Sequence, residues 1–274
     1  MSRNYKEIYS ESLKNPEEFW QKVSEDVFWF KKPTKILKKD NPPFYKWFED
    51  GVTNTCYNAL DLHIDQGRGD KTALIYDSPI TESKAKFTFK ELKEKVSKFA
   101  GALDKQGVKK GDRVIIYMPM IPEAVVAMLA CGRIGAIHSV VFGGFASNEL
   151  ASRIDDSKAK ILITASCGFE PGRTVEYRPL VDGALKLAKH QVEKVILFQR
   201  KDHEVKLNKP LEISWDEALS GANDKDCVEM GANDYAYILY TSGTTGIPKG
   251  IVRDIGGHIV ALKWTMKNIY NIDQ

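Results

Sequence analysis

The sequence lacks any long hydrophobic segment. Within its 274 residues the longest uninterrupted apolar run covers residues 124–131, far short of the roughly 20 residues of a membrane-spanning helix. No apolar stretch typical of a secretory signal follows Met1, so we expect neither a membrane span nor secretion. Charge of one sign is also not in excess, because 40 basic residues face 37 acidic ones and the formal net charge is +3. The basic residues are dispersed, which predicts no nucleic-acid partner.

Cysteines are few, and none is spaced as in a zinc site or a redox motif. The sequence contains no C-x-x-C pair, and none of its five histidines has a partner at metal-ligand spacing. The pattern therefore predicts no metal-binding residues and favours free thiols in a reducing compartment. The four cysteines are Cys56, Cys131, Cys167 and Cys227.

Aromatic residues are concentrated near the N-terminus, and we expect residues 1–62 to form a region of their own. A helix is predicted over residues 16–24, with Asn15 as N-cap and Pro16 at the first helical position. So many large rings predict an arm that packs onto the bulk of the protein, with an exposed partner site as the alternative. The aromatic residues are Trp20, Phe28, Trp29, Phe30, Phe44, Tyr45, Trp47 and Phe48.

From about residue 72 apolar strands alternate with amphipathic helices, and residues 63–274 are expected to form the main domain. Near-continuous apolar strands between such helices predict an α/β fold with a mostly parallel sheet flanked by helices. Strands are expected over residues 72–76, 86–89, 114–118, 137–142, 160–164, 194–198 and 235–240. Helices are expected between Thr88 and Gly107 and over residues 122–133, 147–156, 177–189 and 257–270.

The segment after the last predicted strand is rich in glycine, hydroxyl groups and a lysine. Glycines permit close backbone approach, successive N–H groups form an anion-binding nest, and a lysine suits phosphate. The segment therefore predicts a polyphosphate ligand, with a flexible connector as the alternative. It is not a Walker A loop, because Pro248 stands where that pattern needs glycine before the lysine. The candidate phosphate-binding residues are Thr241, Ser242, Gly243, Thr244, Thr245, Gly246 and Lys249.

Residues 240–250 resemble the phosphate-loop signature of the adenylate-forming, or AMP-binding, superfamily. Residues 117–120, 130–147 and 153–156 narrow the resemblance to short-chain acyl-CoA synthetases, and the aromatic-rich opening resembles the N-terminal region of acetyl- and propionyl-CoA synthetases. Residues 76–79, 168–177 and 252–257 are more similar to the propionate-activating branch than to the acetate one. The resemblance covers essentially the whole chain.

The resemblance implies a ligase that uses ATP, Mg²⁺ and CoA. A short-chain carboxylate, propionate first and acetate second, attacks the α-phosphate of ATP to give an acyl-adenylate and pyrophosphate, and CoA then displaces AMP. The phosphate loop would hold the β- and γ-phosphates. Similar synthetases contact CoA where this sequence has Glu170, Pro171, Gly172 and Arg173, although these residues alone are also typical of a surface turn. Gly143 and Gly144 fit a turn between strand and helix as well as a ligand contact.

The last predicted helix, residues 257–270, is apolar nearly all round and therefore needs burial on several sides. Family members continue for several hundred residues beyond this point, and that remainder carries the acyl pocket and the adenylation lysine. We therefore expect an N-terminal fragment that is inactive alone, with its catalytic residue unassigned. The alternatives are an inert nucleotide- or CoA-binding module and, less favoured, an interaction protein. The expected location is the mitochondrial matrix, as in animal relatives, or the cytoplasm, as in bacterial ones.

Overall fold

A seven-stranded sheet forms the centre of the structure, with the strand order β12-β11-β8-β6-β7-β14-β15. The computed structural model describes residues 4–201, 203–241 and 248–272. Neighbouring strands of this sheet are parallel except β14 and β15, which are antiparallel. The strands are β6 (Arg113–Met118), β7 (Ile137–Phe142), β8 (Ile161–Ala165), β11 (Lys194–Phe198), β12 (Glu212–Ser214), β14 (Tyr235–Thr241) and β15 (Lys249–Asp254).

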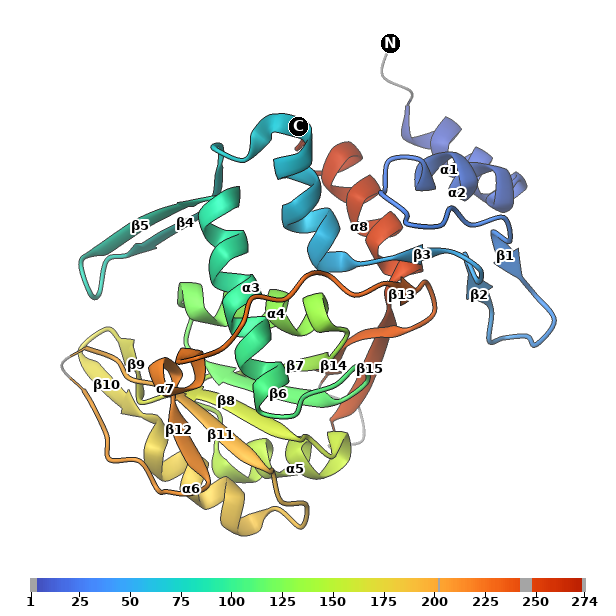
Figure 1. The fold of residues 1–274 in the computed structure, drawn as a ribbon. Coiled ribbons are helices and arrows are strands. Elements are labelled where there is room, and N and C mark those ends of the chain that lie inside the picture. The colour runs from blue at the N-terminus through green and yellow to red at the C-terminus, as the bar shows by residue number, and fades with distance from the viewer. Residues whose placement is uncertain (1–3, 202, 242–247, 273–274) are drawn as a thin grey trace.

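Helices cover both faces of this sheet (Figure 1). On one face α3 packs against α4, and on the other α5 packs against α6. The inner strands are consequently buried almost throughout, which confirms the predicted α/β fold with a mostly parallel sheet. The helices are α3 (Phe89–Lys105), α4 (Pro122–Ile134), α5 (Ser147–Ser157), α6 (Tyr177–Leu187), α7 (Trp215–Leu219) and α8 (Gly256–Asn268).

Local sequence chemistry sets the ends of α3. The hydroxyl of Thr88 accepts a hydrogen bond from the backbone N–H of Glu91, and the Glu91 carboxylate accepts one from the backbone N–H of Thr88. This capping box satisfies two otherwise unpaired donors of the first turn. At the other end Gly107 adopts a φ of 83°, a left-handed conformation that glycine reaches without strain. Both ends agree with the prediction.

Two of the predicted strands do not join the central sheet. β4 (Thr72–Ser78) and β5 (Ser83–Thr88) pair only with each other, as an antiparallel hairpin. The interpretation of this stretch as part of the alternating strand–helix pattern was therefore wrong. The cause is the short connection over residues 79–82, because parallel pairing of successive strands requires a crossover of a dozen or more residues.

The N-terminal region is more regular than its composition suggested. α2 (Pro16–Ser24) agrees with the prediction, although the Asn15 side chain makes no cap hydrogen bond. α1 (Tyr5–Lys14) was not predicted, although Tyr5, Ile8, Tyr9 and Leu13 recur at helical spacing and Asn4 and Glu7 form a capping box at its start. The remaining elements are β1 (Leu37–Lys38), β2 (Lys46–Trp47), β3 (Val52–Thr53), β13 (Met230–Gly231) and the helical segments η1 (Tyr57–Asp61) and η2 (Ile64–Arg68).

The aromatic side chains of this region divide between a small core and the surface. Trp29 and Phe48 are buried in a cluster with Ala232 and with Val260 of α8, so the region packs onto the C-terminal helix. Phe44, in contrast, is 74% exposed. Thus packing accounts for some of the rings and leaves others in contact with solvent.

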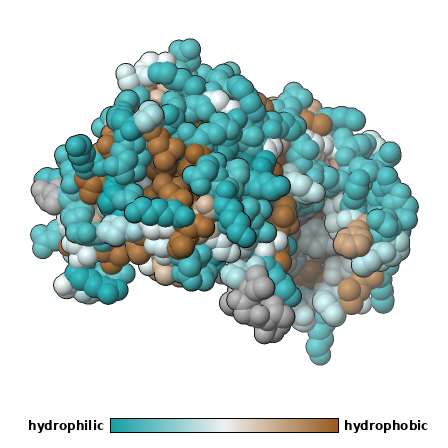
Figure 2. Space-filling model, turned by 90° about the horizontal axis from the view of Figure 1, so that it is seen from below, coloured by the Kyte–Doolittle hydropathy of each residue, from teal (hydrophilic) through white to brown (hydrophobic). Residues whose placement is uncertain are grey.

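Apolar side chains also reach the surface elsewhere. Seen from below, the molecule is largely hydrophilic, with hydrophobic patches between the polar groups (Figure 2). The β14–β15 hairpin exposes Leu239 and Val252, and α8 exposes Leu262 and Met266. α8 buries only Gly256 and Val260, so its apolar sides are mostly uncovered. Among the described residues no helix combines the length and apolar character needed to cross a membrane.

Candidate nucleotide and CoA site

The strand order indicates where a ligand would bind, beside the carboxyl ends of β6 and β8. The chain leaves β6 toward β7 on one side and leaves β8 toward β11 on the other, so the connections diverge between these two strands. In doubly wound α/β sheets ligands bind outside the carboxyl ends of the strands at such a point. Two features follow here: the turn after β7, with Gly143 and Gly144, and a hairpin after β8.

The turn after β7 packs tightly on two buried tyrosines. Tyr117 donates a hydrogen bond from its hydroxyl to the Phe145 carbonyl (2.7 Å) and accepts one from the Gly144 N–H (3.1 Å). Burial raises the pKa of Tyr117 to about 12, so the hydroxyl stays protonated. A Cβ atom at Gly143 would lie 2.2 Å from the Tyr177 hydroxyl. Close packing therefore requires glycine at position 143 without any ligand.

The hairpin after β8 carries the predicted CoA-binding residues. β9 (Cys167–Glu170) pairs with β10 (Arg173–Glu176), and Glu170 and Arg173 face each other across the turn. Gly172 has a φ of 75°, which suits glycine in this turn. The Arg173 Nε atom donates to Glu170 Oε2 (2.7 Å), and the Arg173 side chain is 70% exposed. An exposed ion pair of this kind contributes little to stability, so Arg173 can release Glu170 and bind a phosphate group instead.

The predicted phosphate loop connects β14 to β15. Thr241 ends β14 and pairs in register with Lys249, which begins β15, so these two residues stand at the mouth of the loop. Both are exposed, and Lys249 makes no ion pair with any described residue. The other candidates, Ser242, Gly243, Thr244, Thr245 and Gly246, lie outside the described residues.

The structure does not bring the phosphate-loop strands and the CoA hairpin together. β14 pairs in register with β7 at one position, Tyr237 with His138, and then runs toward α5. There the Tyr240 hydroxyl donates to Asp156 Oδ2 (2.6 Å), and the Arg153 guanidinium lies 5.3 Å from the ring centroid of Tyr240. In Figure 1 the β9–β10 hairpin lies at the left of the central sheet, whereas β14 and β15 form its edge at the right.

Two histidines, His138 and His258, lie beside Tyr237, where β14 pairs with β7. The His258 Nε2 atom is 2.8 Å from the Tyr237 hydroxyl, whereas the buried Nδ1 atom of His138 has no hydrogen-bond partner among the described residues. Its ring stacks on Tyr237 instead, with centroids 5.5 Å apart. Burial lowers the pKa of His138 to about 4, so the ring is neutral near pH 7.

The neutral His138 makes stability depend on pH. Because its pKa is lower in the folded state than the ordinary value near 6.5, the unfolded chain takes up a proton first as the pH falls. We expect the free energy of unfolding to drop by roughly 2 kcal/mol between pH 6.5 and 4 on account of this residue. His138→Phe should flatten that part of a urea-denaturation profile. His203→Phe, at a partly exposed position, is the control, and equal profiles for both variants would contradict the assignment.

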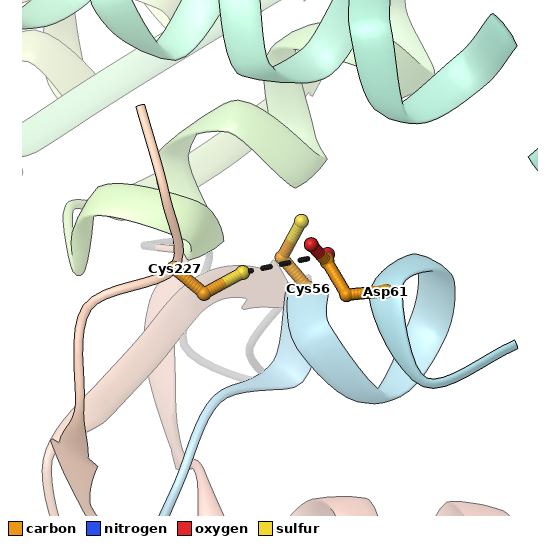
Figure 3. Close-up of side chains that lie close together, drawn as sticks. All are labelled: Cys56, Asp61 and Cys227. Carbon is orange, nitrogen blue, oxygen red and sulfur yellow. Dashed lines mark hydrogen bonds between the residues drawn. The ribbon is translucent and has the colours of Figure 1, made fainter. Parts of the chain in front are cut away.

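The structure also brings together a group of polar residues that the sequence analysis did not predict. Cys56, Asp61 and Cys227 come together in the interior (Figure 3). They surround the Arg133 side chain, and both Arg133 and Cys227 are far in sequence from Cys56 and Asp61. Lone cysteines give no spacing pattern, so only the fold could have identified this group.

Comparison with known proteins places the chain in a family. Residues 63–273 match the family model described as AMP-binding enzyme, and residues 5–59 match the acetyl-coenzyme A synthetase N-terminus. The chain belongs to the AMP-binding enzyme family, which confirms the resemblance noted in its sequence.

The relatives found include short-chain acyl-CoA synthetases. The human protein named acyl-CoA synthetase short-chain family member 3, mitochondrial, is 53% identical over 98% of this chain and 39% of its own length. The acetyl-coenzyme A synthetase of Xylella fastidiosa is 44% identical over 98% of this chain and 42% of its own length. In structure, 99% of this chain matches 41% of an acetoacetyl-CoA synthetase from Streptomyces lividans, with a TM-score of 0.88 and 25% identity. This chain thus spans about two fifths of the length of the relatives that it matches.

Proposed function

We propose that the chain is the N-terminal part of an AMP-forming short-chain acyl-CoA synthetase. The whole protein would join a short-chain carboxylate, propionate first and acetate second, to CoA through an acyl-adenylate, with release of AMP and pyrophosphate. The observation that carries the proposal is the glycine-, hydroxyl- and lysine-rich segment between β14 and β15, in a chain of the AMP-binding family. Within the chain we propose a boundary between residues 1–62 and 63–274.

The donors present fit a polyphosphate. We propose that Thr241, Ser242, Gly243, Thr244, Thr245, Gly246 and Lys249 hold the β- and γ-phosphates of ATP. Hydroxyl and backbone N–H groups donate hydrogen bonds to phosphate oxygens, and the Lys249 ammonium offsets the charge that develops on pyrophosphate as it leaves. Mg²⁺ would accompany ATP, since it binds proteins through few side chains and mainly through substrate phosphates. This chain's part in the reaction is to position the phosphates.

The proposed CoA contact is the turn formed by Glu170, Pro171, Gly172 and Arg173. Support comes from the exposed Arg173 guanidinium and from the position of the hairpin after β8, beside the carboxyl ends of β6 and β8. Phosphate groups of CoA would replace the Glu170 carboxylate as the partner of Arg173.

Arg173→Ala should therefore affect the second half-reaction selectively. We expect the KM for CoA to rise about 10-fold, while the rate of adenylate formation stays near that of the wild type, because only the second step uses CoA. Steady-state kinetics at varied CoA and pyrophosphate exchange without CoA would separate the two steps. Lys186→Ala, an exposed charge on α6, is the matched control. Equal losses in both half-reactions would show that Arg173 has no specific role toward CoA.

The decisive experiment uses the full-length protein. We expect carboxylate-dependent exchange of pyrophosphate into ATP, fastest with propionate and next with acetate, and thioester formation once CoA is added. Binding of ATP or CoA without exchange would favour an inert binding module instead. The name of the human relative includes "mitochondrial", and we propose the mitochondrial matrix as the location of this protein. Cell fractionation tests this, and recovery in the cytoplasmic fraction would support the alternative location.

A further inference from the structure

Two cysteines from distant parts of the chain meet in the interior. Cys56 immediately precedes η1, and Cys227 lies in the segment between α7 and β13. Both sulfur atoms and one carboxylate oxygen of Asp61 lie within 4.8 Å of one another (Figure 3). Cys56 is fully buried, whereas Cys227 is partly exposed.

Hydrogen bonds link the segment around Cys56 to the segment around Cys227, and link the latter to the end of α4. The Asn54 side chain, two residues before Cys56, donates from Nδ2 to the Val228 carbonyl, one residue after Cys227 (2.9 Å). The Val228 N–H in turn donates to the Arg133 carbonyl at the end of α4 (2.9 Å). These hydrogen bonds therefore hold Cys56 and Cys227 next to each other in the folded protein.

An arginine occupies the position that a metal ion would need. Arg133 is fully buried, and its Nη1 atom lies 2.7 Å from Asp61 Oδ2, 3.1 Å from Cys227 Sγ and 3.6 Å from Cys56 Sγ. A divalent cation bound to these three atoms would lie directly against a permanent positive charge. The cluster already contains its cation, and that cation favours a thiolate over a thiol.

We propose that Cys56 and Cys227 are a redox pair, which a hydroperoxide converts into a reversible disulfide. The inference does not depend on the proposed ligase activity. A disulfide has an S–S bond of about 2.05 Å, so the two sulfurs, within 4.8 Å, need to approach by less than about 2.8 Å.

The two thiols have different roles in the reaction. The Cys227 thiol and the Arg133 charge lower the pKa of Cys56 despite its burial, whereas the pKa of Cys227 is raised. A peroxide entering from the partly exposed side of Cys227 is attacked by the Cys56 thiolate: an S–O bond forms, the O–O bond breaks, and an alkoxide or hydroxide leaves with a proton from solvent. Cys227 then attacks the sulfenic acid sulfur, loses its proton, and displaces the hydroxyl as water. Two thiols and one hydroperoxide thus give one disulfide, one alcohol or water, and one further water.

The other two cysteines are in environments that favour the unreactive thiol. Cys131 is fully buried, and burial raises its pKa to about 12. Burial also raises the pKa of Cys167. Among the described residues neither accepts a hydrogen bond from an arginine, as Cys56 and Cys227 do from Arg133, so oxidation should be selective.

A disulfide here would tie the N-terminal region to the segment that leads through β13 into β14. It would close a loop of about 170 residues, and long loops gain most from a cross-link in the chain-entropy account. We expect the melting temperature to rise by about 5–10 °C on oxidation and to fall again on reduction.

The test is peptide mapping of the full-length protein after brief treatment with hydrogen peroxide and alkylation of the remaining thiols. We expect one cross-linked peptide pair containing Cys56 and Cys227, released by dithiothreitol, with Cys131 alkylated only after unfolding. In Cys227→Ser the cross-link should be absent and Cys56 should react with dimedone, a sulfenic-acid reagent. Cys131→Ser, the matched control, should keep the cross-link.

Three results would overturn the proposal, and two of them need no variant that could fail to fold. The first is that Cys56 and Cys227 both remain fully alkylatable after peroxide treatment of the wild-type protein, and the second is that they form disulfides with other cysteines. The third is stoichiometric zinc in the freshly purified wild type that is lost in Cys56→Ser, which would identify a metal site despite Arg133.

Discussion

Replacing Arg133 by methionine is expected to destabilise the protein by about 3–5 kcal/mol, which is a large part of the stability of a typical domain. Arg133 donates to both carboxylate oxygens of Asp61, at 2.7 and 3.0 Å, and its side chain is fully buried. Burial alone would raise the pKa of Asp61, but the hydrogen bonds and charges of Arg133 and Lys93 hold it below its ordinary value. Without Arg133 the carboxylate keeps the partly exposed Lys93, 3.2 Å away, and a weak hydrogen bond from the Cys227 thiol at 3.6 Å.

Urea denaturation of the wild type and Arg133→Met measures this loss. The double variant Arg133→Met with Asp61→Leu should recover much of it, because it removes the carboxylate charge that the single variant leaves without its buried arginine partner. Lys186→Met, at an exposed site on α6, should stay within about 0.5 kcal/mol of the wild type. A loss under 1 kcal/mol in Arg133→Met would mean that the ion pair does not stabilise the fold.

The sequence predicted best those elements that local chemistry determines. β7 and β11 begin and end at the expected residues, and α3 lies between its predicted cap, Thr88, and Gly107. Each is a buried apolar strand or an amphipathic helix with a cap, so the information lies within a few neighbouring residues. The family resemblance added the likeness to acyl-CoA synthetases, which periodicity alone does not show.

The same reasoning could not predict contacts between residues that are far apart in sequence. Nothing in the spacing of Cys56, Asp61, Arg133 and Cys227 indicates that they meet, because the fold brings them together from η1, α4 and the segment before β13. The course of β14 is similar: its apolar pattern predicts a strand, but the contact of Tyr240 with Asp156 on α5 depends on tertiary structure. The sequence therefore predicted the candidate phosphate-binding residues without predicting where their strand runs.

Replacing Lys249 by alanine is expected to slow adenylate formation by about 10- to 150-fold, equivalent to roughly 1.5–3 kcal/mol of charge-assisted hydrogen bonding. Lys249 begins β15 opposite Thr241, is exposed, and makes no ion pair with a described residue. Its ammonium group is thus available to a phosphate. The charge on the departing pyrophosphate grows toward the transition state, so the loss should appear in the rate of the first half-reaction more than in ATP affinity.

Two half-reactions measured on the full-length protein distinguish this role from a general defect. Carboxylate-dependent pyrophosphate exchange should fall in Lys249→Ala, whereas thioester formation from added acyl-adenylate and CoA should stay close to the wild-type rate, because pyrophosphate has already left. Lys186→Ala should be normal in both assays. Exchange at the wild-type rate in Lys249→Ala would remove this lysine from the phosphate site. Equal losses in both half-reactions would instead indicate damage to the fold, since a phosphate contact acts only while ATP is bound.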